Sequence, residues 1–137
     1  MDKHLINVNG IIFVSQALDY QGSSPYVDDN IISYITYIPT LAATAWYHKK
    51  VDTSGDFEAF IDATRQFAVD ELLPALFKGN ALSKADRKRI VDGLHRYTGL
   101  SKQYIEQVDF RINAFRFAKE LLRDEGVAVG FLDGRYK

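Results

Sequence analysis

The residues that perform acyl-transfer chemistry are present in this chain, but they do not occur in the pattern that this chemistry requires. A serine nucleophile on a strand-to-helix turn stands in Gly-x-Ser-x-Gly, because the sharp turn exposes its hydroxyl group. The nearest run, Gly22-Ser23-Ser24-Pro25, does not fit that pattern and follows no strand directly. We interpret it as an ordinary turn, and we expect no catalytic residue in this chain.

The sequence also offers no convincing metal site. His4, His48 and His95 lie far apart, and none has a partner at the spacing of a helical metal site. We expect His48 to lie at a helix end and His95 beside the solvent-facing side of its helix. Asp28 and Asp29 could bind a hard cation, but adjacent acids ahead of a helix are usually capping residues. We therefore predict neither a metal nor an organic cofactor.

Two tyrosines could line a binding pocket. Tyr34 and Tyr37 stand three residues apart just before Pro39, in a segment that follows an apolar run at residues 10–15. Ligands of open α/β sheets bind beyond the carboxyl ends of the strands, which is where this segment would lie. The spacing by itself favours ordinary packing, since residues three apart share one helix face. Both interpretations remain open from the spacing alone.

The composition is typical of one folded domain with balanced charge. The chain has 137 residues, 47% of them hydrophobic, which is enough for an ordinary core. Its 17 basic and 18 acidic residues supply no positive field for nucleic acid. No stretch approaches the roughly 18 apolar residues of a membrane helix, and the N-terminus does not resemble a signal peptide. Without cysteine, disulfides and thiolate chemistry are excluded, and the compartment stays open.

A short strand is predicted at each end of the chain. Residues 10–15 form an unbroken β-branched and aromatic run, which is typical of a strand covered on both faces. Residues 127–132 are the second strand candidate. Two strands at opposite ends of a chain cannot make an independent sheet with two covered faces. We therefore expect the sheet partners of these strands to lie outside the chain.

About five or six helices are predicted between the two strands. Pro39 suits the first turn of a helix that ends at residues 48–50. A capping box at residues 53–56 should open the next helix, and Pro74 should kink or break it. The expected apolar stripe of that helix comprises Phe57, Phe60, Ile61, Thr64, Phe67, Ala68, Leu72, Leu73, Leu76 and Phe77.

The later helices have local start and stop signals. Ser83 with Asp86 forms another capping box, and Gly99 suits the end of that helix. Ser101 can cap a short helix after it, and Asp109 is expected to open the last helix. That last helix should stop at Gly126, and its expected buried residues are Phe110, Phe115, Phe117, Leu121 and Leu122 in some combination.

Several blocks of the chain resemble the bacterial branch of the serine carboxypeptidase family, whose members are α/β hydrolases. Residues 7–19 resemble the strand and loop that follow the family's nucleophile, and residues 37–48 resemble the start of its helical cap. Residues 110–124 and 129–136 resemble the end of that cap. The match spans nearly the whole chain, through blocks that are each moderately specific.

The resemblance implies a mainly α cap segment cut from a larger hydrolase. Residues 1–20 would be a sheet strand and loop, residues 21–126 the helical cap, and residues 127–137 the return strand toward the parent sheet. The parent would release C-terminal residues from peptides through a Ser-His-Asp triad, without a metal or cofactor. All three triad positions would lie outside this segment, so the segment should be inert alone. Many relatives are exported, although a leader would precede these residues.

The resemblance also implies substrate-side wall positions. Ala17, Leu18, Tyr34 and Tyr37 match positions that line the pocket for the residue preceding the scissile bond. The expected partners are thus the remainder of the parent hydrolase and a peptide substrate, with no nucleic acid and no membrane. This chain lacks the cysteines of secreted family members, so a disulfide-braced cap is not a guide to its packing.

A different class of function remains as the alternative. The same amphipathic helices could form a self-contained helical protein-interaction domain with no catalytic role. Under the first hypothesis, Met1 marks an imposed boundary of the segment, and its unpaired terminal strands should cause self-association. A Gly-x-Ser-x-Gly motif encoded upstream of Met1 would distinguish the two hypotheses.

Overall fold

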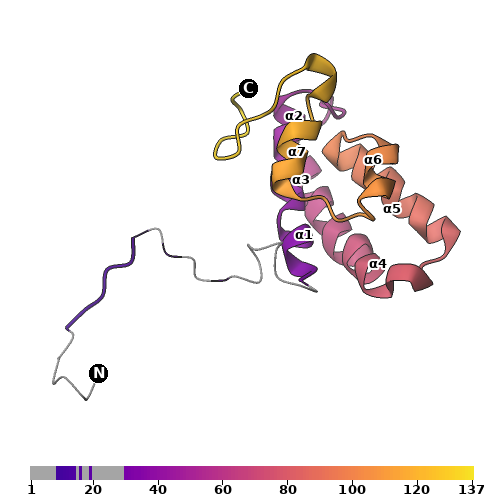
Figure 1. The fold of residues 1–137 in the computed structure, drawn as a ribbon, viewed down its shortest axis with the longest axis horizontal. Coiled ribbons are helices and arrows are strands. Elements are labelled where there is room, and N and C mark those ends of the chain that lie inside the picture. Colours follow the sequence, from indigo (N-terminus) through magenta and orange to yellow (C-terminus); the bar gives the residue numbers. More distant parts are fainter. Residues whose placement is uncertain (1–8, 15, 17–18, 20–29) are drawn as a thin grey trace.

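The computed structural model of this chain describes residues 9–14, 16, 19 and 30–137, and this described part is mainly helical (Figure 1). Short helical turns join the longer helices, so the chain from residue 31 onward is a compact helical body. The α-helices are α1 (Ile32–Thr36), α2 (Ile38–Tyr47), α3 (Phe57–Phe67), α4 (Leu73–Lys78), α5 (Lys84–Thr98), α6 (Lys102–Gln107) and α7 (Ala114–Glu120). The π- and 3₁₀-helical turns are η2 (Ala68–Leu72), η3 (Gly79–Ala81) and η4 (Arg123–Glu125).

The two expected flanking strands are not seen in the described residues. Residues 9–14 form no ladder, and residues 127–132 are also outside any regular element. Ile11, Ile12, Phe13 and Val14 are 64, 92, 64 and 85% exposed. A strand needs backbone partners on a neighbouring strand, so an apolar run without such a neighbour does not become one.

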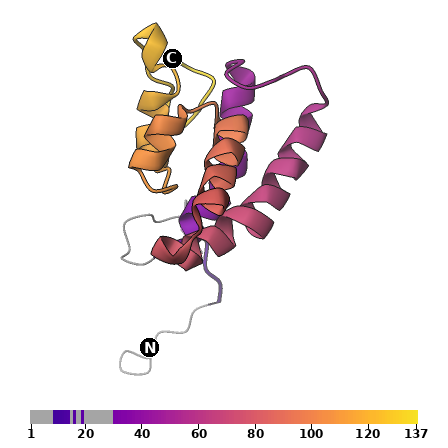
Figure 2. The same cartoon turned by 90° about the vertical axis from the view of Figure 1, so that its right-hand side faces the viewer.

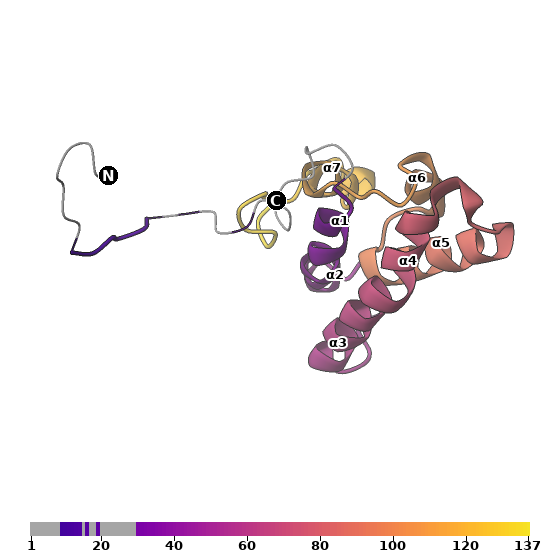
Figure 3. The same ribbon diagram turned by 90° about the horizontal axis from the view of Figure 1, so that it is seen from below.

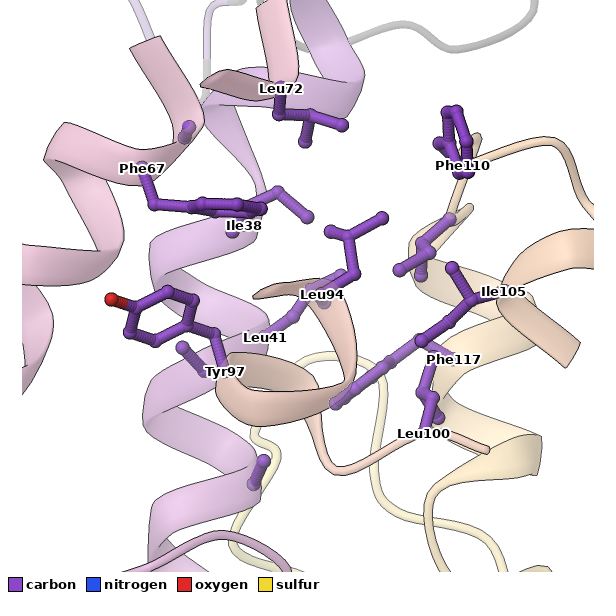
Figure 4. Close-up of a cluster of buried hydrophobic side chains, with 14 of the residues drawn as sticks. Ile38, Leu41, Phe67, Leu72, Leu94, Tyr97, Leu100, Ile105, Phe110 and Phe117 are labelled. Carbon is purple, nitrogen blue, oxygen red and sulfur yellow. The ribbon is translucent and has the colours of Figure 1, made fainter. Parts of the chain in front are cut away.

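The core lies where α2, α3 and α5 meet. In Figure 4, Ile38 and Leu41 of α2, Phe67 of α3 and Leu94 and Tyr97 of α5 point into one cluster. The ring centroids of Phe67 and Tyr97 are 5.2 Å apart, within the range of favourable aromatic pairs. α5 runs between the α3–α4 pair on one side and α6 and α7 on the other (Figure 2). Burial on both sides therefore makes α5 the central helix of the body.

The caps of α5 and α6 confirm their local signals. The Ser83 hydroxyl accepts a hydrogen bond from the Asp86 backbone N–H at 3.0 Å and donates to the Asp86 carboxylate at 2.8 Å. The Ser101 hydroxyl accepts from the Tyr104 backbone N–H at 3.2 Å. Gly99 ends α5 with a left-handed backbone, φ +70°. Each signal depends on residues within one turn, which is why the sequence alone revealed it.

Two predicted helix starts were wrong. The cap of α3 is Asp56 itself, whose carboxylate accepts from the Ala59 backbone N–H at 2.9 Å. The cap of α7 is Asn113, while Asp109 lies in the preceding turn with φ +49°. Asp109 instead forms ion pairs with Arg87 at 2.8 Å and Arg111 at 2.6 Å. Where several capping residues stand close together, tertiary contacts decide which one caps the helix.

Pro74 is accommodated without breaking the helix. The five residues of η2 form a π-helical turn directly before α4, in which Pro74 occupies the first turn. Within this continuous run Pro74 has no N–H to donate to the preceding turn, and the π-helical turn before it takes up that interruption. α3, η2 and α4 thus follow one another as one continuous rod (Figure 3). Phe77, expected in its apolar stripe, is 72% exposed, which corrects the prediction at the end of the rod.

We predict that Gly99→Ala destabilises the protein by about 2–4 kcal/mol. An alanine would adopt the left-handed backbone at a cost of about 1–2 kcal/mol. A Cβ at Gly99 would also lie 2.7 Å from the backbone oxygen of Lys50, which adds about 1–2 kcal/mol of overpacking. Urea unfolding followed by circular dichroism measures the free energy of unfolding.

Gly126→Ala is the matched control for this substitution. Gly126 has nearly the same φ, +71°, but a Cβ there would meet no atom within 4 Å. It should therefore cost only the backbone term, about 1–2 kcal/mol. Equal losses for both variants would show that the Lys50 contact does not constrain the end of α5.

Candidate functional site

The candidate site lies on the outer face of α2, beside the C-terminal segment. The inner face of α2 buries Ile38, Leu41, Ala42 and Ala45 in the core, so its remaining side chains face away from the core. Thr40 and Tyr47 are exposed on this other side. Residues 130–136, which we call the C-terminal loop, pass along this side of α2 (Figure 1).

A hydrogen bond and a close contact hold the C-terminal loop on α2. The Nε2 atom of His48, just after α2, lies 2.7 Å from the carbonyl oxygen of Gly134. A carbonyl oxygen only accepts, so Nε2 must carry the proton in this bond. A Cβ on Gly134 would lie 2.7 Å from Oγ1 of Thr44, so no larger residue fits here without displacing the loop.

The loop is also closed on itself. The Gly130 backbone N–H donates to the Tyr136 carbonyl at 2.8 Å, and the Tyr136 N–H donates to the Asp133 carbonyl at 3.3 Å. At its base, the Val129 N–H donates to the carbonyl of Ala118 in α7 at 2.8 Å. These bonds tie α2, α7 and the loop into one local structure.

The larger hollow at this site has three aromatic residues in its wall. It measures about 420 Å³ and lies between α2, the start of α3 and the C-terminal loop. Trp46 and Tyr47 of α2 and Phe57 of α3 line it, with Asp133 and Arg135 at the loop side. The ring centroids of Trp46 and Phe57 are 5.7 Å apart in an edge-to-face pair. This volume and lining fall in the range of small-molecule and side-chain pockets.

A smaller hollow adjoins it, with lining residues in common. It measures about 140 Å³ and is lined by Tyr37, Phe117 and Val129, with Phe131 and Leu132 of the loop. The Phe131 ring stacks on that of Phe115 with centroids 3.9 Å apart. Thr40, Thr44 and Gly134 line both hollows, so the two are parts of one groove. We call it the α2 groove.

Of the wall residues named from the sequence, the structure places Tyr37 in the α2 groove. Tyr34 is half-buried and packs against the core, and it lines neither hollow described above. Ala17 and Leu18 lie outside the described residues, as do Asp28 and Asp29. Both tyrosines thus pack against the core, and of the two Tyr37 also lines the groove.

Most of the groove lining was not predicted from the sequence. Phe57 was assigned to the core stripe of α3, whereas it is 39% exposed at the groove. Trp46 and Tyr47 gave no signal beyond their aromatic character. Asp133-Gly134 is a turn dipeptide that could have indicated the loop. The position of the loop on α2 depends instead on a contact between distant residues, His48 and Gly134.

The two described histidines bond to the backbone rather than to a hydroxyl group in the hydrogen bonds described for them. His48 and His95 both bond to backbone carbonyls, Gly134 and Leu100, each at 2.7 Å. Ser33 is buried, and its hydroxyl has no hydrogen-bond partner. Nucleophilic catalysis needs a hydroxyl within reach of a base. Among these same residues no cluster of three or more histidine or acidic side chains could hold a metal, and no helix is long and apolar enough to cross a membrane.

The charges at the groove rim neutralise each other. Asp133 and Arg135 form an ion pair at 2.7 Å, and the Arg135 backbone N–H also donates to the Asp133 carboxylate at 3.1 Å. The hydrogen bonds from the Arg135 side chain and backbone lower the pKa of Asp133 to about 2. The groove therefore presents aromatic and aliphatic surface with a paired charge at its edge.

No protein-family model matches the chain, and neither the curated proteins nor the solved structures contain a match to it.

We predict that Arg135→Gln raises the pKa of Asp133 from about 2 toward its ordinary value of 3.8. The folded-state pKa is depressed, so the ion pair stabilises the loop above about pH 4 and is lost as pH falls toward 2. The carboxyl carbon shift of Asp133, followed by NMR between pH 1.5 and 6, measures this pKa. Arg65→Gln, which removes the Asp62 ion pair in α3, should leave it unchanged. An unchanged Asp133 titration in Arg135→Gln would contradict the prediction.

Proposed function

We propose that this chain is the helical cap segment of a serine carboxypeptidase-like hydrolase and contributes the wall of a peptide-binding pocket. The observation that carries the proposal is the exposed apolar run Ile11–Val14. Four successive apolar side chains in water are unfavourable, at about 1.5–3 kcal/mol for each one left unburied. Such a run fits a strand whose neighbours belong to another part of a larger protein.

The helical body supports the same proposal. Its core is closed by α2, α3 and α5 without any residue of the run Ile11–Val14. A cap must fold as a unit while its connecting strands join a different layer, and this division matches that requirement.

The wall positions of the proposed pocket are Ala17, Leu18, Tyr34 and Tyr37. Tyr37 supports this assignment best, since its side chain lines the α2 groove. Tyr34 packs one turn earlier against the core and would act by positioning Tyr37. In the parent, a serine, histidine and aspartate from outside this segment would release the C-terminal residue of a peptide by acyl transfer.

A self-contained interaction domain is the second candidate function. The closed helical core favours it, because such a core needs no further chain to form. Its binding surface would be the α2 groove, which has the aromatic lining that interaction sites favour.

Labelling of the native protein separates the two candidates. An antibody raised against these 137 residues would recover the native protein from extract treated with a fluorophosphonate probe. We expect a labelled species heavier than the 15.6 kDa of these residues, because the serine lies in the remainder of the hydrolase. The isolated chain, treated identically, should stay unlabelled. An unlabelled native protein of 15.6 kDa would overturn the hydrolase proposal and favour the interaction domain.

We further predict that Tyr37→Ala changes peptide preference in the labelled enzyme. Removing the ring takes away apolar wall that a bulky side chain contacts and that alanine does not reach, so kcat/KM for a bulky apolar residue before the scissile bond should fall about 10-fold relative to alanine. Phe77→Ala, at an exposed position on α4, is the matched control and should not alter this ratio. An unchanged ratio in Tyr37→Ala would remove Tyr37 from the pocket wall.

A further inference from the structure

Two apolar surfaces are uncovered in the described part of the chain. One is the run Ile11–Val14, which we call the arm, and its four side chains are 64–92% exposed. The other is the α2 groove, where Tyr47 is 57% and Leu132 97% exposed. Exposed apolar side chains that are grouped in this way indicate an interaction site, whereas apolar side chains exposed singly are normal.

The arm and the groove match in charge. Residues 9–14 contain no charged side chain. The charged residues that line the groove, Asp133 and Arg135, are already paired with each other at 2.7 Å. An uncharged segment can therefore enter the groove without leaving a charge unpaired, whereas an acidic or basic segment would compete with this ion pair.

The two surfaces also match in size. A hollow of about 420 Å³ joined to one of about 140 Å³ provides room for several branched or aromatic side chains. Two exchanged arms would bury about 800 Å² of side-chain surface, taking about 100 Å² for each of eight side chains. The groove walls would contribute a similar area, which reaches the roughly 1,600 Å² of a stable protein–protein interface.

A second copy of the chain is the occupant that the arrangement favours. Figure 1 shows residues 9–14 running apart from the helical body, which leaves the arm accessible to another molecule. Because each copy carries both an arm and a groove, a reciprocal exchange closes with two-fold symmetry and leaves neither surface exposed.

We propose that the 137-residue chain forms a symmetric dimer in which each arm docks in the α2 groove of the other copy. This interface uses a groove between a helix and a loop, and it needs no strand pairing. The inference concerns these residues by themselves and does not rest on the proposed function, whose test is made on the native protein.

Solution mass gives the first test. Light scattering after size exclusion should give twice 15.6 kDa for the chain, with dissociation on dilution. Phe13→Asp places a charge in the docked arm and should raise the dissociation constant at least 10-fold. Phe77→Asp is the matched control, since it charges a comparably exposed phenylalanine on α4, and it should leave the dimer intact. A chain that is monomeric at about 100 µM, or a dimer unaffected by Phe13→Asp, would overturn the proposal.

Disulfide trapping gives the second test and identifies the occupant. The chain has no cysteine, so the introduced thiols are the ones that can cross-link, and each variant oxidised alone gives the background from pairing with itself. Mixing Ile12→Cys with Ala43→Cys should give a cross-linked pair under mild oxidation, because Ala43 lines the groove. Mixing Ile12→Cys with Val69→Cys, exposed on η2 outside the groove, should give far less.

The double variant Ile12→Cys/Ala43→Cys distinguishes docking between copies from docking within one copy. Cross-linking at dimer mass beyond the amount that either single variant gives alone supports the exchange of arms. Cross-linking at monomer mass would show that each arm occupies its own groove, and would overturn the dimer. Equal trapping of Val69→Cys would also overturn the proposal, because the arm would then contact surfaces without preference.

Discussion

The burial of one face of α2 determines how the rest of the molecule is arranged. Ile38, Leu41, Ala42 and Ala45 face α3 and α5, and the two alanines allow these helices to approach closely. The opposite face of α2 then has to lie outside the core. It carries Thr44, against which Gly134 packs, and it leads to His48, which bonds to Gly134. The groove is therefore a direct consequence of which side of α2 the core uses.

Local chemistry explains which parts of the fold the sequence revealed. Ser83, Gly99 and Ser101 act on backbone groups within one turn, and all three were predicted correctly. Asp109 was assigned wrongly because its carboxylate pairs with the distant Arg87, whereas Asp56 caps α3 through a local bond and was assigned to the wrong place in the capping box. The groove was anticipated only through Tyr37, since the exposure of Trp46, Tyr47 and Phe57 depends on how α2 meets α3 and the C-terminal loop. The expected strands depend on a neighbouring strand, and the described residues do not supply one.

The proposed cap function and the proposed dimer share one physical origin. The helical body satisfies its own core, and the surplus apolar surface is concentrated in Ile11–Val14 and along the α2 groove. In a larger hydrolase, sheet neighbours would cover the first surface and peptide would occupy part of the second. In the chain by itself, each surface is the best available cover for the other, because both are apolar and neither presents an unpaired charge.

The π-helical turn before Pro74 affects the direction in which α4 faces. Such a turn contains one residue more than an α-helical turn, so the residues after it are rotated by about 100° relative to an uninterrupted α-helix. The helix thereby absorbs a one-residue insertion between Ala68 and Leu72 without a break. Loss of a single codon there would restore regular winding, yet it would rotate α4 and change which of its side chains meet α5. The number of residues in this turn is therefore tightly constrained, although Val69 and Asp70 are exposed and their side chains could vary.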